Sequence, residues 1–97
     1  MRNKIDSYEF DNCSDFTSIT ILDSVTLIDS YAFYYCKNLV SVIIPDSVTS
    51  ISNYGFFGCA KLEIVNYTGS EEEWAAIRVG MNNAPLQNVT KVYNYNP

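Results

Sequence analysis

The sequence of 97 residues contains no histidine, and its six basic residues are outnumbered by eleven acidic ones. Without histidine the chain lacks the most frequent general base and a common zinc ligand, and it has neither a glycine-rich phosphate loop nor a nucleophile motif. We therefore predict that it is not an enzyme and that it holds no cofactor and no metal ion. The lysines and arginines are scattered rather than clustered, which argues against binding of nucleic acid.

Long apolar runs are also absent. No run approaches 18 residues, so no membrane-spanning segment is predicted. Residues 1–10 lack the apolar core of a signal peptide and read instead as part of a repeating unit. We therefore expect the chain to be a fragment, or a short product, of a longer array. Its 47% apolar and 18% charged residues are typical of a folded domain.

The three cysteines reveal the repeat, because Cys13, Cys36 and Cys59 lie 23 residues apart. Most of the chain repeats with them: residues 23–26 and 46–49 both read Asp-Ser-Val-Thr. A fixed period of this length is typical of a solenoid, in which each coil buries its apolar face against the next. Solenoids usually offer extended binding surfaces, so the repeat favours recognition over chemistry.

Apolar residues recur at fixed places in each unit and predict where the strands lie. Alternation over residues 18–22, 41–45 and 63–67 predicts one short strand per coil, with successive coils pairing in parallel. A second inward-facing set, predicted to form another very short strand, is Ile5, Ile28, Ile51, Val25 and Val48. The column that fills the remaining side of the core is Phe10, Phe33 and Phe56.

The cysteine column leaves three alternatives. Buried free thiols are the simplest, since unpaired cysteine packs as a small apolar group. Neighbouring coils lie roughly 5 Å apart, which also allows a single disulfide with one thiol left over. A zinc site would need a fourth ligand in a chain without histidine.

Residues 70–97 read as a C-terminal cap. Ser70 followed by Glu73 is a capping box, which predicts a helix over residues 71–79 that stops at Gly80. Trp74 is expected to lie across the open end of the last coil. The three glutamates of the first helical turn are predicted to be cap charges rather than acid catalysts or a cation site. A turn at Pro85-Leu86 should then lead into a strand over 89–93.

The repeat resembles a known family. The pattern Leu39-x-x-Val42-x-Ile44-Pro45-x-Ser47-Val48-Thr49-Ser50-Ile51-x-x-x-x-Phe56-x-x-Cys59 is similar to the BspA-type leucine-rich repeat, and the resemblance covers residues 4–67. Leu22 departs from it, since the family usually has proline there. The resemblance implies an α/β-type repeat solenoid whose leucine-rich coils occupy residues 1–69, in a partial first repeat followed by 13–35, 36–58 and 59–69. It also implies adhesion or protein recognition by a cell-surface or secreted protein, with no catalytic residues.

The positions outside the core columns carry the functional prediction. Tyrosine repeats at one offset that the family leaves variable, with further aromatic residues close by. Tyrosine on a rigid frame is a good recognition group, because it is large, amphipathic and loses little conformational entropy. The predicted binding residues are Tyr8, Tyr31, Tyr34, Tyr35, Tyr54 and Phe57, with Ile43 on the outward strand face as a second candidate surface.

Three interpretations of these residues stay open. They bind a protein, such as a host or matrix protein; they stack on a carbohydrate; or they only pave the coil edge of an architectural cap. At the N-terminal coil, Ile5 and Phe10 have no preceding coil to pack against. We expect either that the first ten residues fold over this end or that two molecules associate there.

Overall fold

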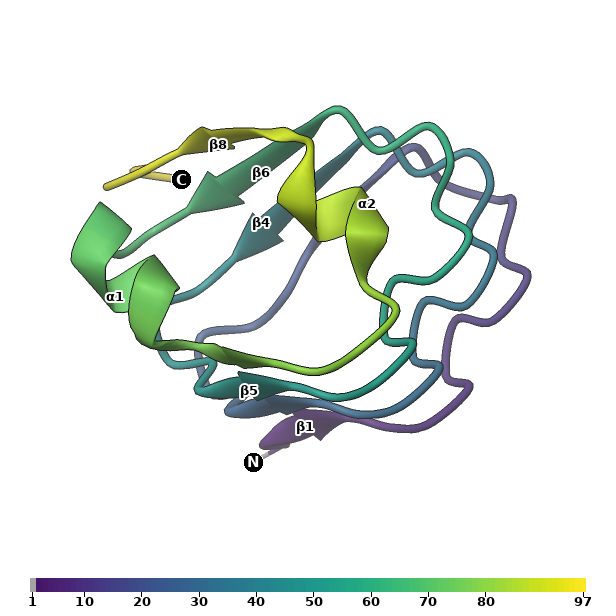
Figure 1. The fold of residues 1–97 in the computed structure, drawn as a ribbon, viewed down its shortest axis with the longest axis horizontal. Coiled ribbons are helices and arrows are strands. Elements are labelled where there is room, and N and C mark those ends of the chain that lie inside the picture. Colours follow the sequence, from purple (N-terminus) through teal and green to yellow (C-terminus); the bar gives the residue numbers. More distant parts are fainter. Residues whose placement is uncertain (1) are drawn as a thin grey trace.

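The computed structural model describes residues 2–97, whose backbone winds into stacked coils (Figure 1). Each coil contributes one strand to each of two parallel sheets. The first sheet is, in order, β2 (Ser18–Thr20), β4 (Ser41–Ile44), β6 (Ile64–Tyr67) and β8 (Thr90–Val92). The second is β1 (Lys4–Ile5), β3 (Leu27–Ile28), β5 (Ser50–Ile51) and β7 (Arg78–Val79). The helices α1 (Glu71–Ala76) and α2 (Ala84–Gln87) belong to the last coil.

From β1 to β6 the register of the strands equals the sequence repeat. Ser18 pairs with Ser41, and Lys4 with Leu27, each 23 residues further along. The predicted parallel pairing of the first two strands is therefore confirmed, although β2 ends already at Thr20. The second, very short strand of each coil is confirmed as well, although Val25 and Val48 lie before it and not in it. β1 and β2 are the first strands of their sheets, and self-association at that end stays a prediction.

Columns of equivalent side chains fill the space between the two sheets. The rings of Phe10, Phe33 and Phe56 stack with centroids 5.2 and 4.8 Å apart. Phe33 and Phe56 have no exposed surface. The ring spacing matches the distance of roughly 4.8 Å between neighbouring strands, so the coil pitch itself brings the rings into contact.

The cysteine column lies beside these rings. The thiol of Cys36 donates to the carbonyl of Phe10 (2.8 Å), and that of Cys59 to the carbonyl of Phe33 (3.1 Å). All three cysteines are free, with Cys36 and Cys59 buried and Cys13 partly exposed, so the interpretation as free thiols is confirmed. Hydrogen bonding to the Cys36 sulfur, together with burial, raises the pKa of the Cys59 thiol well above its ordinary value.

Thiol labelling of the native protein is expected to modify Cys13 first. Cys36 and Cys59 should react at least about tenfold more slowly, because a reagent reaches them only after local opening. Timed alkylation followed by peptide mass spectrometry measures the three rates, with the urea-unfolded chain as the control. Rapid modification of native Cys36, or an unreactive disulfide-linked pair, would contradict the buried column.

The last coil departs from the repeat and corrects the predicted helix boundary. α1 ends at Ala76 instead of continuing to residue 79, and Ile77 already has extended backbone. Arg78 and Val79 form β7, which adds to the open edge of β5. Ile77 and Val79 are β-branched and favour a strand. Pairing of residues 78–79 with β5 is therefore more favourable than one more turn of α1 before Gly80.

The start of α1 agrees with the prediction. The Ser70 hydroxyl accepts from the Glu73 amide (3.1 Å), and the Glu73 carboxylate accepts from the Ser70 amide (3.0 Å). The capping box is therefore present, and Glu73 acts as a cap charge. The half-buried Trp74 packs edge-on against Tyr67, with ring centroids 5.2 Å apart, so its contact is with the end of β6.

Two features of the last coil were not predicted. Pro85 and Leu86 lie in the short helix α2, where Leu86 is buried, rather than in a simple turn. Just before this helix, the Asn83 side chain is 1% exposed. Its oxygen accepts from the amide of Phe56 (2.8 Å), and its nitrogen donates to the carbonyl of Ser52 (3.0 Å). The strand predicted over 89–93 is observed as β8.

Candidate recognition surface

The turn that follows β1, β3 and β5 holds a tyrosine in left-handed backbone. The φ angle is 61° at Tyr8, 63° at Tyr31 and 65° at Tyr54. Few residues other than glycine adopt this conformation, and asparagine is enriched among those that do. In the last coil the equivalent residue is Asn82, with φ 63°. The turn therefore requires a left-handed residue, but it does not require tyrosine.

The three tyrosine rings form a ladder along the stacked coils. Tyr8 and Tyr31 stack with centroids 4.9 Å apart and planes inclined by 3°, and Tyr31 and Tyr54 with 5.0 Å and 10°. Tyr31 thus has a ring against each of its two faces. Tyr8, at the end of the ladder, is 53% exposed. Both faces of Tyr31 are therefore covered, whereas Tyr8 has a tyrosine ring against one face only.

A second group of rings lies against this ladder. Tyr34 and Phe57 occupy equivalent positions one repeat apart and stack at 5.7 Å and 18°. Tyr34 also meets Tyr31 edge-on (5.1 Å), and Phe57 contacts Tyr54 at 5.2 Å. The ladder and the second group therefore form one continuous surface, which we call the aromatic cluster: Tyr8, Tyr31, Tyr34, Tyr35, Tyr54 and Phe57.

Tyr35 is held in place by a glycine of the next coil. Its ring lies so close to Gly58 that a β-carbon there would stand 2.4 Å from the ring. Gly58 also has a φ of 82°, but the equivalent Tyr35 and Asn12 are left-handed too, so the close approach of the ring is what excludes a side chain at Gly58. Tyr35 itself is left-handed, with φ 56°, and 37% exposed. Part of its role is thus to pack on the adjacent coil.

The aromatic cluster is uncharged. Partial desolvation among the rings raises the pKa of Tyr34, and the neighbouring Tyr35 and Tyr31 hydroxyls raise it further. Since an ordinary tyrosine ionises near pH 10, the Tyr34 hydroxyl stays neutral at physiological pH. The tyrosines therefore offer hydroxyl donors and acceptors beside apolar ring edges.

Ile43 does not join these residues. It points outward from β4, in the other sheet, and lines a hollow at the turns that follow β2 and β4. These turns lie at the end of the coil where α1 is found, and the turns with the aromatic cluster lie at the opposite end (Figure 1). The two candidate surfaces of the sequence prediction are thus separate.

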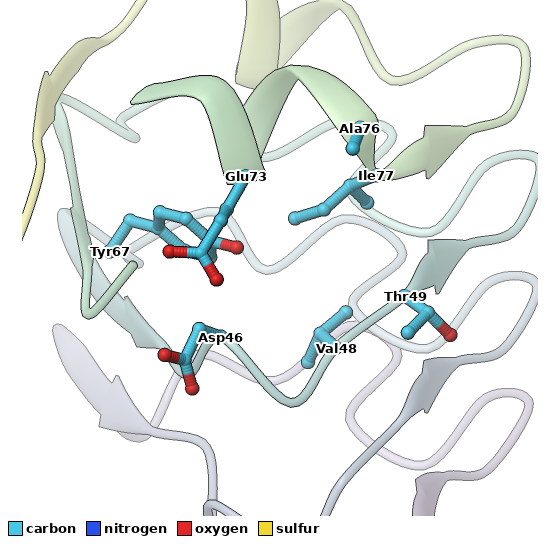
Figure 2. A pocket seen from close by; sticks show the side chains of 7 residues that line it. All are labelled: Asp46, Val48, Thr49, Tyr67, Glu73, Ala76 and Ile77. Carbon is cyan, nitrogen blue, oxygen red and sulfur yellow. The ribbon is translucent and has the colours of Figure 1, made fainter. Parts of the chain in front are cut away.

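A smaller hollow of about 190 Å³ lies under α1. Figure 2 shows Glu73 directed toward Tyr67 and Asp46, while Ile77 faces Val48 across the hollow. Burial raises the pKa of Tyr67, and the negative charges of Glu73 and Asp46 add to this effect. The Glu73 carboxylate already accepts a hydrogen bond from the Ser70 amide in the capping box. We therefore assign Glu73 a structural role in this hollow and not a role in binding.

Residues 2–97 contain no cluster of three or more histidine, cysteine or acidic side chains that could hold a metal ion. In the same range, neither α1 nor α2 has the length and apolarity that crossing a bilayer requires.

Comparison with known proteins identifies the repeat. The profile of the "BspA type Leucine rich repeat region (6 copies)" matches residues 3–76. The chain belongs to the BspA type leucine rich repeat family. This match includes the whole aromatic cluster and α1, and it confirms the resemblance of the sequence pattern and the predicted fold class.

A solved structure supports the same assignment. A leucine rich cell surface protein from Faecalibacterium prausnitzii A2-165 is similar to this chain, with 34% sequence identity and a TM-score of 0.76. The similarity covers 78% of this chain and 20% of the other, so the chain corresponds to about a fifth of that protein. No curated protein matched the sequence.

Proposed function

We propose that this leucine-rich repeat module is not an enzyme and binds a protein partner, as part of a cell-surface or secreted protein. The aromatic cluster is the observation that carries the proposal. Three of its tyrosines occupy left-handed positions that the fold fills with asparagine in the last coil. A left-handed residue other than glycine costs about 1–3 kcal/mol, so tyrosine is a poor choice for folding alone.

The geometry of the ladder favours a protein over a carbohydrate. A sugar stacks on the face of an aromatic ring, and both faces of Tyr31 are covered by its neighbours. At Tyr31 the ring edge and the hydroxyl remain for a partner, and these are groups that protein partners commonly use at the centre of an interface. The similarity to a cell surface protein supports the location, although the matched region covers only 20% of that protein.

Replacing Tyr31 by asparagine tests the proposal with little expected effect on stability. The loss of two stacking contacts, about 0.5–1.5 kcal/mol each, is offset by relief of the left-handed strain. Binding to a partner found in a panel of purified matrix and serum proteins should weaken at least about tenfold. Surface plasmon resonance measures this binding, and a glycan array is screened in parallel. Gln87→Ala, at an exposed position of α2, is the control.

Each other outcome supports a different function. Glycan binding that is lost on Tyr31→Asn would replace protein recognition by carbohydrate recognition. If neither screen gives a ligand and Tyr31→Asn lowers only the melting temperature, the rings pave the coil edge and the module is architectural.

A further inference from the structure

A second surface lies at the other end of the coils, around Ile43. There the turns after β2 and β4 border a hollow of about 430 Å³, and Pro97 also lines it. The size falls in the range of roughly 300–1,000 Å³ that is usual for ligand pockets. Its lining includes the apolar residues Leu22, Ile43 and Pro45 and the polar residues Asp23, Asp46 and Thr68.

Leu22 is the unexpected residue of this surface. It stands one repeat before Pro45, at the position where the sequence pattern has proline, and it is 62% exposed. A proline would close the turn and leave less apolar surface in water. The leucine instead adds a large apolar side chain to the hollow without contributing to the core.

Two carboxylates stand beside this apolar surface. Asp23 and Asp46 occupy equivalent positions in neighbouring coils, and both line the hollow. Among residues 2–97, none of those that line the hollow is basic. Within residues 2–97, the ion pairs involve Arg2 and Lys4 at the other sheet, so neither aspartate is neutralised by them.

We propose that this hollow binds a lysine or arginine side chain of a protein partner. The aliphatic stem lies on Leu22, Ile43 and Pro45, and the cationic group is held between Asp23 and Asp46. Long basic side chains bury their methylene stems in this way while the charge stays near water and carboxylates. A purely aliphatic group would desolvate the carboxylates without compensation, and an acidic group would be repelled.

This site is independent of the aromatic cluster, which lies at the opposite turns. One partner could contact both sites only if it extended along the whole length of the strands that separate them. The two proposals can therefore be refuted independently. Tyr31→Asn tests binding by the aromatic cluster, whereas binding in the hollow is tested with variants that leave the aromatic cluster unchanged.

Nuclear magnetic resonance of the full chain tests the hollow directly. The probe is acetyl-Gly-Lys-Gly-amide, and acetyl-Gly-norleucine-Gly-amide has an uncharged stem of similar length. The lysine peptide should shift the amide signals of Leu22, Ile43 and Thr68 in a saturable way, with a dissociation constant of roughly millimolar order. The norleucine peptide should bind at least about tenfold more weakly, and added salt should weaken only the lysine peptide.

Matched variants complete the experiment. Asp23→Asn with Asp46→Asn should abolish the difference between the two peptides, whereas Asp11→Asn with Asp15→Asn makes the same change of net charge away from the hollow. Leu22→Pro, which installs the residue of the next repeat, should weaken both peptides several-fold. Equal binding of the two peptides, equal effects of the two double variants, or shifts confined to the aromatic cluster would each overturn the proposal.

Discussion

Replacing Phe33 by alanine is expected to lower the free energy of unfolding by about 3–5 kcal/mol. The Phe33 ring has no exposed surface and lies between two other rings, 5.2 Å from Phe10 and 4.8 Å from Phe56. Its removal leaves a cavity in the middle of the column, which rigid coils on both sides cannot close. Since small domains are stable by only about 5–15 kcal/mol, much of the stability would be lost. Urea unfolding followed by circular dichroism measures the change.

The adjacent residue provides the control. Tyr34 follows Phe33 in sequence but lies outside the core, half-buried in the aromatic cluster. Tyr34→Ala should cost about 1 kcal/mol, because it removes ring contacts without opening a core cavity. A larger loss for Tyr34→Ala than for Phe33→Ala would mean that inward and outward positions have been exchanged.

The coils could be predicted because one physical constraint recurs at every repeat. In the strands from β1 to β6 each residue pairs with its equivalent 23 positions away, so a residue that faces the core at one coil must face it at the next. Ile28 and Ile51 illustrate this, since both are buried and paired as the common offset requires. The free state of the thiols was also predictable as one of three alternatives, because a lone column of cysteines packs well without a bond.

The last coil was less predictable because it has no following coil. α1 competes with β7 for residues 77–79, and the open edge of β5, which is a tertiary feature, decides the result. The helix α2 is too short to have a periodic pattern of its own. A local signal did exist, since proline near the start of a helix is common, but the same residue also suits a turn.

The sequence predicted which residues form the candidate surface, but it did not predict how their rings are arranged. A shared offset indicated the tyrosine row, yet the stacking of Tyr31 between two rings depends on left-handed backbone at all three positions. That geometry matters for function, because it covers both faces of Tyr31 and leaves the edge of this ring for a partner. Ile43 is separate from the aromatic cluster because it lies in the other sheet. The hollow beside Ile43 could not be predicted, because one of its lining residues, Pro97, is distant in sequence.

Replacing Asn83 by aspartate is expected to destabilise the protein by about 3 kcal/mol at pH 7. In the repeating coils the amides of Phe10 and Phe33 donate to the backbone carbonyls of Ala32 and Gly55. The amide of Phe56 donates instead to the Asn83 side-chain oxygen, because the chain turns into α2. Asn83 thus takes the place of the carbonyl that another coil would supply.

Aspartate keeps this acceptor but replaces the donor that Asn83 directs at the carbonyls of Ser52 and Gly80. A buried carboxylate facing carbonyl oxygens should have a pKa above the unfolded value of about 3.9. The folded state then binds the proton more tightly, so Asn83→Asp should lose stability as the pH rises from about 4 toward neutrality.

The control is Asn82→Asp. Asn82 is the neighbouring residue, lies on the surface and has left-handed backbone that aspartate tolerates. Urea unfolding of both variants at pH 4 and pH 7 separates the local effect from the titration of other carboxylates, and equal pH dependence of the two would refute the role of Asn83.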